Sequence, residues 1–246
     1  MTIAAFTSFK KSWTGKTVLS VMTALAFPRR PVCIIDCGGG CSTAFGVSDQ
    51  PGLMEVCRGE EDLGNVVLEV KISVPRDAKG SRIVSGARSR VWVLPYGRGE
   101  IGVNALIDGA LWTASVVNSY ADIIMDLPAY RNGSLDPLLE DVDVAVIVTN
   151  PDPLSIRAVL KYERLEALLR EEVAVIPVLN RVRGSTPAAL GAMLRDVGEV
   201  TVIPFDPALG HATRDLPRAL QDITDDTLES IIELSERISK GEGTTL

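Results

Sequence analysis

The chain has 246 residues, of which 46% are hydrophobic, and a formal net charge of −7 at pH 7. This composition is sufficient for a buried core, and the acidic balance excludes a protein that coats nucleic acid over its whole surface. The sequence contains no run of about 18 apolar residues that could span a membrane, and no signal-peptide pattern opens it. We therefore expect a cytoplasmic protein in which residues 1–246 form a single domain.

The four cysteines, Cys33, Cys37, Cys41 and Cys57, lie close together in the sequence. In a cytoplasmic protein we expect them to be reduced thiols rather than a disulfide framework. Their C-x₃-C-x₃-C spacing is not a standard zinc or iron–sulfur pattern. We interpret them as small buried side chains near a strand end, with metal binding as the less favoured alternative.

The N-terminal stretch combines three features in a fixed order. Residues 3–9 are apolar and typical of a strand, residues 10–17 form a loop that ends in Gly-Lys-Thr, and residues 18–27 are typical of a helix. A strand, a tight loop ending in this triplet and a helix that opens there are the context of a phosphate-binding P-loop. Backbone N–H groups at such a helix N-terminus favour an anion, so this stretch predicts a phosphate site.

Three residues of this loop have separate expected roles. Gly15 lets the backbone approach a phosphate without an intervening Cβ. Lys16 would add a positive charge beside the β- and γ-phosphates, and the Thr17 hydroxyl would be a ligand to Mg²⁺. The full P-loop pattern has a glycine where this chain has Lys10, so the nucleotide hypothesis also depends on the position of the triplet between strand and helix.

A second candidate site residue, Asp36, ends the apolar run of residues 31–36 and precedes three glycines at 38–40. Such a run is typical of a strand buried on both faces, with a flexible loop beyond its end. Ligands of open α/β sheets bind at that end of the strands. Asp36 is therefore placed to meet Mg²⁺ or a water molecule, and the alternative is a solvated carboxylate at a strand end.

An uneven distribution of charge marks the segment between Lys71 and Arg98, which has seven basic residues and one acid, Asp77. In an acidic protein this asymmetry is informative. Two interpretations of it stay open: a surface for an acidic partner, DNA or lipid headgroups, and a loosely ordered, solvated loop. Within the segment we expect a strand at residues 90–95.

Residues 52–67 are expected to be helical and capped by turns, and residues 106–120 to form a helix. Strands and helices alternate along the rest of the chain. The strand expected at 121–128 runs into Asp126 and has the form of a Walker B strand, whose acid lies beside the metal and the attacking water. The further expected elements are strands at 141–149, 173–180 and 199–204 and helices at 153–170, 185–197 and 225–240. This order predicts an α/β fold of the P-loop NTPase type, with a mostly parallel sheet and helices on both faces.

The last expected helix, at about 225–240, is amphipathic with an acidic polar face. A peripheral membrane helix has lysine and arginine on that face, so no membrane anchor is evident here. We expect this helix to pack on the sheet.

The order of these features resembles the MinD/ParA family of P-loop ATPases, whose phosphate loop reads K-G-G-x-G-K-T. The resemblance extends from about Ile3 to Ala212. Residues that match the family pattern include Lys11 as the signature lysine, Gly15, Lys16 and Thr17, Asp36, Asp-Leu-Pro-Ala at 126–129 and Asn150-Pro151. The Gly-Leu-Met-Glu-Val-Cys-Arg-Gly-Glu-Glu-Asp-Leu segment at 52–63 resembles a helix pair of the family, and Leu-Asn-Arg at 179–181 and Ile-Pro-Phe-Asp at 203–206 resemble the two segments that hold the adenine.

The resemblance implies ATP or ADP and Mg²⁺ as cofactors and assigns roles to matching residues. The implied catalytic residues are Lys11, Asp36 and Asp126. The implied metal-binding residues are Thr17, Asp36 and Asp126. The implied nucleotide-binding residues are Lys11, Thr14, Gly15, Lys16, Thr17, Val18, Asn180, Arg181, Pro204 and Asp206.

The chain departs from the family pattern at Ser12-Trp13, where the family has two glycines, at Ala158 and at Gly38. Two hypotheses follow. In the first, the chain is a slowly hydrolysing switch ATPase that forms a homodimer with ATP and acts with an unidentified protein partner in positioning or partitioning of the division site, DNA or polar machinery. Non-specific DNA is a further candidate partner through the segment from Lys71 to Arg98. In the alternative, the chain is a degenerate, non-hydrolysing member that serves as a dimeric scaffold.

Overall fold

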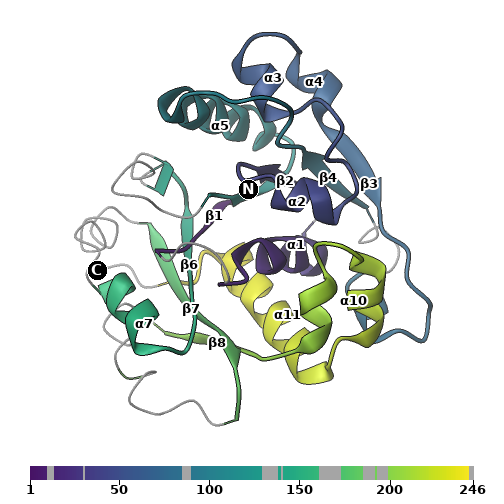
Figure 1. The fold of residues 1–246 in the computed structure, drawn as a ribbon, viewed down its shortest axis with the longest axis vertical. Coiled ribbons are helices and arrows are strands. Elements are labelled where there is room, and N and C mark those ends of the chain that lie inside the picture. Colours follow the sequence, from purple (N-terminus) through teal and green to yellow (C-terminus); the bar gives the residue numbers. More distant parts are fainter. Residues whose placement is uncertain are drawn as a thin grey trace.

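The computed structural model describes residues 1–9, 14–29, 31–84, 90–128, 138–139, 141–160, 173–184, 192 and 199–243. Its centre is one eight-stranded sheet with the order β3-β4-β2-β5-β1-β6-β7-β8 (Figure 1). The strands are β1 Ile3–Thr7, β2 Val32–Asp36, β3 Leu68–Lys71, β4 Arg90–Leu94, β5 Asp122–Asp126, β6 Val144–Thr149, β7 Ala174–Val182 and β8 Thr201–Pro204. The α-helices are α1 Lys16–Ala26, α2 Gly40–Ala44, α3 Leu53–Cys57, α4 Leu63–Val66, α5 Val103–Val117, α7 Pro153–Leu160, α10 Leu216–Asp222 and α11 Asp225–Lys240.

Every pair of neighbouring strands in this sheet is parallel except β3 with β4. Helices cover both faces of the sheet (Figure 1). The predicted fold class, an α/β protein with a mostly parallel sheet between helices, is therefore confirmed.

The central strands are buried on both faces, which explains their nearly continuous apolar sequences. Successive residues of β1 point to opposite sides, so Ala4 and Phe6 belong to one core and Ala5 to the other. The first core lies under α1, α10 and α11, and the second under α3, α5 and α7. Strands of this kind need a helix layer on each side, because neither face can be left in water.

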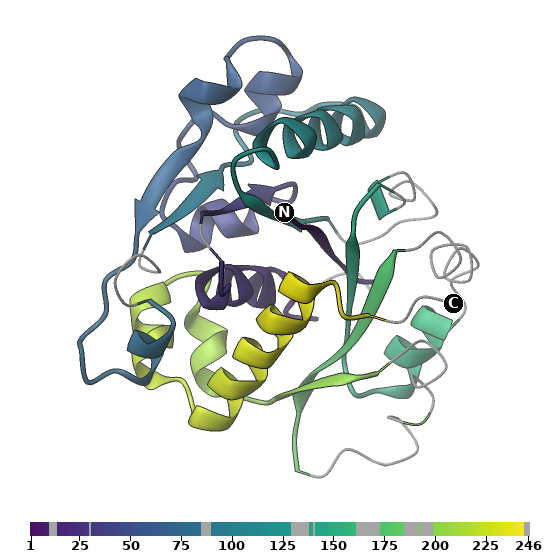
Figure 2. The ribbon, with the colours of Figure 1, turned by 180° about the vertical axis from the view of Figure 1, so that it is seen from behind.

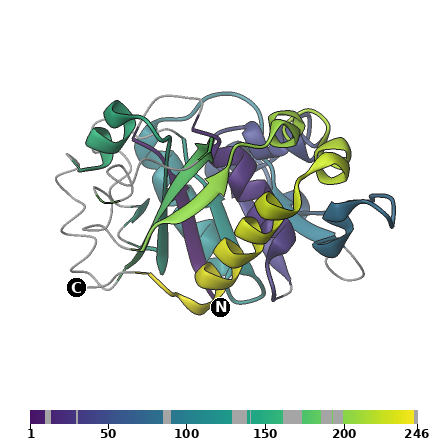
Figure 3. The ribbon, with the colours of Figure 1, turned by 90° about the horizontal axis from the view of Figure 1, so that it is seen from below.

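Helix α11 agrees with the predicted bounds and lies against α1 and β8 (yellow in Figures 2 and 3). Its residues Leu228, Ile231, Leu234 and Ile238 are fully buried. The Ser235 hydroxyl lies 3.2 Å from the carbonyl oxygen of Ala26 at the end of α1. The prediction that this helix packs on the sheet is confirmed by its contacts with β8. Among the described residues no helix has the length and apolarity needed to cross a membrane.

Part of the basic segment between Lys71 and Arg98 has regular structure in its described residues, 71–84 and 90–98. It contains the short 3-10 helix η1, Lys79–Arg82, and the predicted strand at 90–95 is present as β4. Three of its cations form ion pairs with acids, which connect Lys79 to Asp225, Arg82 to Glu229, and Arg90 to Glu69. The acidic face of α11 therefore neutralises part of this segment.

Other elements differ from expectation. The glycine-rich segment after β2, expected as a flexible loop, contains α2. The stretch at 52–67, expected to be helical and given by the resemblance as a helix pair, is present as α3 and α4, with Gly59 at φ +68° between them. The edge strand β3 and helix α10 were not expected. The helix expected at 153–170 is described only to Leu160, and the one expected at 185–197 lies outside the described residues except at position 192.

The sheet register positions the candidate site. Strands β2 and β5 are neighbours, and Asp36 lies opposite Asp126 at their C-terminal ends. Strand β1 flanks β5 on its other side, with Phe6 opposite Asp126. The loop that leads from β1 into α1 therefore starts beside both acids.

Candidate functional site

Gly15 is the N-cap of α1 and has a left-handed backbone conformation, with φ +81°. A Cβ at this position would lie 2.3 Å from Nδ2 of Asn180, so a side chain fits neither the backbone angle nor the space. Gly15 therefore lies close against Asn180 with no side chain between them. It precedes a helix N-terminus, where backbone N–H groups can bind an anion.

The first turns of α1 place three polar side chains on the carboxylate of Asp126. Lys16 Nζ lies 2.6 Å from Oδ1 and donates to it, and the Thr17 hydroxyl donates to Oδ2 at 2.7 Å. Ser20, one helical turn beyond Lys16, donates to Oδ1 at 3.0 Å. Lys16 and Asp126 are both buried. An ammonium, two hydroxyls and a carboxylate thus meet at the C-terminal edge of the sheet.

Asp36 is fully buried and accepts four hydrogen bonds from the segment that follows it. The N–H groups of Gly38 and Gly39 donate to Oδ1 at 3.0 and 2.7 Å, and the N–H and hydroxyl of Ser42 donate to Oδ2, each at 2.6 Å. Burial raises the pKa of the Asp36 carboxyl and the charge of Asp126 raises it further, while the bonds from Ser42 and Gly38 oppose the rise. These bonds help α2 to form in a glycine-rich segment, because the carboxylate accepts from the Ser42 N–H in the first turn of the helix and from the two N–H groups just before it.

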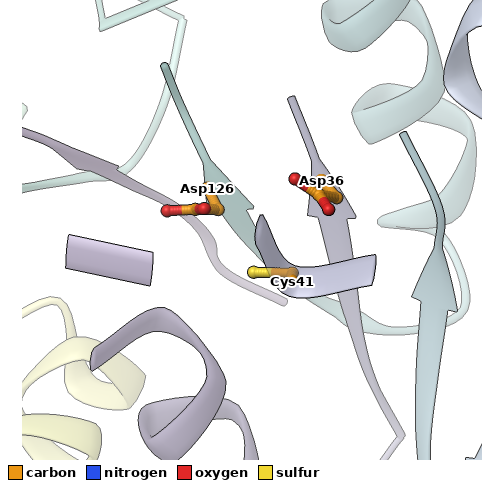
Figure 4. Close-up of side chains that lie close together, drawn as sticks. All are labelled: Asp36, Cys41 and Asp126. Atoms are coloured by element: carbon orange, nitrogen blue, oxygen red, sulfur yellow. The ribbon is translucent and has the colours of Figure 1, made fainter. Parts of the chain in front are cut away.

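Asp36, Asp126 and Cys41 form a buried cluster whose ligand atoms all lie within 4.8 Å of one another (Figure 4). Burial and then the charges of Asp126 and Asp36 raise the pKa of the Cys41 thiol well above its usual value, although Lys16 opposes this. A thiol is a soft ligand, which suits zinc or copper(I) better than Mg²⁺. The remaining donors, two carboxylates and the nearby Thr17 hydroxyl, are hard oxygen atoms that suit Mg²⁺.

A pocket of about 210 Å³, here called the side pocket, opens next to Gly15. Its lining comes from the start of α1, the end of β7 and the segment after β8. The lining residues are Gly15, Val18, Asn180, Arg181, Pro204, Phe205, Asp206, Pro207, Leu209 and Gly210.

Asn180 connects the side pocket to Thr14, the residue before the N-cap of α1. Its Nδ2 donates to the carbonyl oxygen of Thr14 at 2.7 Å, although the two residues are 166 positions apart. The N–H of Arg181 donates to Oδ1 of the same amide at 2.9 Å. Arg181 has φ +63°, which is unusual for a residue other than glycine. The backbone at the end of β7 therefore orients the Asn180 amide so that it holds the Thr14 carbonyl, next to Gly15.

Asp206 also lines the side pocket and is buried. Its Oδ1 accepts from the N–H of Ala208 at 2.9 Å, and its Oδ2 accepts from the N–H and hydroxyl of Thr224, each at 2.8 Å. Burial acts to raise the pKa of Asp206, but the hydrogen bonds from Thr224 and Ala208 outweigh it, and the pKa is lowered. The carboxylate caps the 3-10 helix η3, Pro207–His211, and holds the start of α11.

The structure brings most of the predicted residues into one region. Gly15, Val18, Asn180, Arg181, Pro204 and Asp206 line the side pocket, Lys16 and Thr17 contact Asp126, and Asp36 lies opposite Asp126. Lys11 lies outside the described residues, as do Ser12 and Trp13.

Sequence reasoning gave no site role to Ser20 or Ser42, while it named Cys41 only as a less favoured metal ligand and Phe205 only as part of the Ile-Pro-Phe-Asp segment. For Ser20 a signal existed, because it lies four positions after Lys16 and therefore on the same face of α1. For Ser42 and Phe205 no spacing rule applies, since their roles depend on how segments from different strands meet.

No protein-family model and no curated protein sequence matches the chain. Solved structures do match. The MinD cell division protein of Aquifex aeolicus superposes with a TM-score of 0.70, over 98% of this chain and 97% of that chain, at 21% identity. The same protein in its MinC:MinD complex gives 0.71, over 98% and 96%, at 21% identity.

Two further structures extend this likeness. The septum site-determining protein MinD of Pyrococcus horikoshii, complexed with Mg-ADP, gives a TM-score of 0.68 at 21% identity, over 98% of this chain and 97% of that chain. A ParA family ATPase of Chlorobium tepidum gives 0.69 at 18% identity, over 96% and 98%. From β1 to the end of α11, the chain has the fold of the MinD and ParA ATPases.

Proposed function

We propose that this protein binds ATP with Mg²⁺ at the start of α1 and acts as a MinD/ParA-like switch ATPase. The observation that carries the proposal is the meeting of Lys16, Thr17 and Asp126 at the C-terminal edge of a parallel sheet, directly after a glycine N-cap. An ammonium, a hydroxyl and a carboxylate in this arrangement are the side chains that P-loop proteins use for phosphates and their metal ion. The Mg-ADP bound by P. horikoshii MinD, which shares the fold, supports the same ligand class.

Each residue has a defined part in this proposal. The N–H groups after Gly15 bind phosphate oxygens, and Lys16 exchanges its contact with Asp126 for the β- and γ-phosphates. Thr17 and Asp126 would hold Mg²⁺, which when bound neutralises phosphate charge. Asn180 keeps the loop backbone in place through Thr14.

Hydrolysis also requires a group that orients the attacking water, and Asp36 is the candidate from the sequence. In the structure its two oxygens accept four hydrogen bonds from residues 38–42. A carboxylate occupied in this way is a weak general base until that segment rearranges. This observation favours slow hydrolysis, and it also favours the alternative hypothesis of a non-hydrolysing dimeric scaffold.

The cellular role that we propose is positioning or partitioning, through a nucleotide-dependent homodimer and a protein partner. The MinC:MinD complex, formed by a protein of the same fold, supports a protein partner. The hypothesis of DNA binding by the basic segment is weakened, because Lys79, Arg82 and Arg90 are paired with acids.

The test is calorimetric titration of the purified protein with ATP and Mg²⁺, followed by measurement of ATP turnover. We expect binding that Lys16→Ala abolishes, and turnover that Lys11→Ala reduces. Lys79→Ala is the matched control, because Lys79 is half exposed and pairs with Asp225 at the surface. Absence of binding heat in the wild-type protein would refute the proposal.

The same preparations separate the switch from the scaffold. A switch dimerises more tightly when ATP is present, because the nucleotide shifts the equilibrium by its differential affinity for the dimer. A scaffold dimerises equally with and without ATP. Sedimentation velocity with and without nucleotide distinguishes the two.

A further inference from the structure

We propose that the outer face of α5, with the pocket beside its C-terminal half, docks a basic segment of a protein partner, and that one lysine or arginine side chain of this segment enters the pocket. The inference rests on the proposed function only for the presence of a protein partner. The surface lies toward the N-terminal edge of the sheet, where Ile3 opens β1 and the end of α5 leads into β5. The proposed nucleotide site lies at the opposite, C-terminal edge, so a partner bound here leaves it open.

The sequence of α5 is unusual for a helix on the outside of a protein. Its 15 residues include one charged residue, Asp108, whereas the 16 residues of α11 include seven. A helix at a protein surface carries charged and polar residues on the face opposite the core, and a helix that is apolar all round is normally covered. Helix α5 lies at the periphery of the ribbon (Figures 1 and 2). Its composition therefore indicates a cover that belongs to another molecule.

Large apolar side chains are exposed on the outer side of α5. Trp112 is 53% exposed and Val116, one helical turn later, is 39% exposed, while Tyr120, which follows the helix, is 66% exposed. At Gly109 the helix lies so close to Cys57 of α3 that a Cβ has no room. Helix α3 thus covers α5 at that position, and the exposed apolar side chains begin in the turn after it. Contiguous exposed apolar side chains of this kind mark interaction surfaces.

A pocket of about 350 Å³, here called the α5 pocket, lies beside these side chains. Three apolar and three polar residues line it: Ile3, Leu111, Ala114, Ser115, Asn118 and Asp141. The Oδ1 atom of Asn118 is buried and has no hydrogen-bond partner in the part of the chain that the structure describes. An acceptor buried without a donor costs free energy, which a ligand that donates to it would recover. Asp141 is exposed and adds a negative charge to the same pocket.

A basic side chain has the chemistry that this lining requires. Lysine and arginine combine an aliphatic stem with a charged group that only donates hydrogen bonds. The stem would lie along Ile3, Leu111 and Ala114, and the cation would donate to Asn118 Oδ1 and pair with Asp141. Partial burial of such a pair beside apolar atoms makes its hydrogen bonds stronger than those between neutral groups.

The charges of the surface identify the class of partner. Residues 103–120 contain neither lysine nor arginine, and neither does the lining of the α5 pocket, so that the charged residues are Asp108 and Asp141. Nucleic acid and anionic lipid bind surfaces rich in cations, which this one is not. A second copy of the chain would bring acids against acids across a two-fold axis. A protein segment with basic residues among apolar ones complements both the charge and the exposed rings.

The α5 pocket is tested with n-butylguanidinium, which reproduces a basic side chain, and with n-butylurea, its neutral analogue. We expect saturable changes in the amide NMR signals of Ala114, Ser115 and Asn118, with a dissociation constant for the cation on the order of 1 mM. Butylurea should bind about tenfold more weakly, and Asp141→Asn should remove most of that difference. Equal affinity for the two probes, or no signal change at these residues, would overturn the inference.

The wider surface is tested by panning a phage library of random short peptides on the whole chain. Enriched peptides should carry lysine or arginine among apolar residues. Synthetic copies should bind Trp112→Gln/Tyr120→Gln at least about tenfold more weakly than the wild-type protein, with an unchanged thermal midpoint because the replaced rings are largely exposed. Leu154→Gln is the matched control, since Leu154 is an exposed apolar residue of α7, and it should bind as the wild type does. Enrichment of peptides without a basic residue, or equal binding to all three proteins, contradicts the inference.

The variant Lys16→Ala separates this inference from the proposed function. It should lose ATP and keep full affinity for butylguanidinium and for the peptides, because Lys16 lies at the opposite edge of the sheet. If the wild-type protein binds these probes through α5 but not ATP, the proposed function fails and the docking surface stands. If it binds ATP but neither probe, the docking surface fails alone.

Discussion

The ammonium of Lys16 lies 2.6 Å from Oδ1 of Asp126, and both side chains are nearly inaccessible to solvent. Two charges in such a place stabilise each other only as a pair, because each has lost its hydration. The contact also keeps Lys16 turned toward the sheet. A phosphate that binds at the start of α1 must therefore compete with Asp126 for this ammonium.

Removing one member of this pair should be costly. We expect Lys16→Met to lower the free energy of unfolding by about 3 kcal/mol, because Asp126 stays buried without its cation. The double variant Lys16→Met/Asp126→Leu should be less destabilised than the sum of the two single variants. Urea denaturation of the four proteins measures this. Lys79→Met is the control and should cost less than about 1 kcal/mol, since its pair with Asp225 is exposed. Strict additivity would contradict the interpretation.

A comparison of Gly15 with Gly59 separates the cost of a strained backbone from the cost of a steric clash with Asn180. Both have positive φ, +81° and +68°, but a Cβ at Gly59 meets no atom within 4 Å, whereas one at Gly15 meets the Asn180 amide. We expect Gly59→Ala to cost roughly 1–2 kcal/mol from backbone strain alone. Gly15→Ala should cost more and should also abolish nucleotide binding. Equal losses of stability, measured by thermal and urea denaturation, would show that Asn180 moves aside freely.

Glu55 should make the free energy of unfolding larger at neutral pH than at acidic pH. Its carboxylate accepts from the N–H groups of Gly52 at 2.8 Å and Arg98 at 2.9 Å. Burial acts to raise the pKa of Glu55, but these hydrogen bonds outweigh it and the pKa is lowered. A lowered pKa in the folded state stabilises the protein above the unfolded-state pKa, about 4.3, and this contribution is lost as the pH falls through the folded-state value.

The variant Glu55→Gln tests this sign. We expect it to lower the free energy of unfolding by about 1–3 kcal/mol at pH 7, because an amide cannot accept both bonds without opposing one donor. The difference from the wild-type protein should shrink toward pH 3. Urea denaturation at a series of pH values measures it, with Glu61→Gln, at a position only partly buried, as control. A loss that is the same at both pH values would assign the effect to packing.

The basic segment should bind DNA weakly. Because Lys79, Arg82 and Arg90 are paired with carboxylates, we expect little salt-dependent retention on non-specific DNA. Combined replacement of Arg82, Arg88 and Arg90 by alanine should leave retention on a DNA column unchanged between low and moderate salt. Strong retention that this variant loses would instead identify the segment as a DNA surface.

Long apolar runs made most of the sheet predictable. Strand β5 was expected at 121–128 and is Asp122–Asp126, because a strand buried on both faces needs apolar residues at successive positions. Strand β3 escaped prediction because it is short and lies at the edge, with alternate residues exposed. Helix α2 escaped it because Gly40 opens the helix, and what supports it there is the buried carboxylate of Asp36.

The candidate site was predictable to the extent that its chemistry is local in sequence. Gly-Lys-Thr between a strand and a helix identified the start of α1, and the acid at the end of a strand identified Asp126. The contact between Asn180 and Thr14 spans 166 positions, so no spacing rule could assign that amide to the loop. Whether Asp36 is free or fully hydrogen-bonded likewise depends on the path of the chain after it.

The hydroxyl of Ser235 on the carbonyl of Ala26 joins the last helix to the helix that opens at Gly15. Leu228, Ile231, Leu234 and Ile238 share one core with Met22 and Leu25, so α1 is covered by a segment more than 200 positions away. A protease that cut the chain before Asp225 would strip this cover from α1 and expose apolar side chains to water. Cleavage near the C-terminus would thereby disturb the packing of α1, the helix near the N-terminus that bears Lys16 and Thr17.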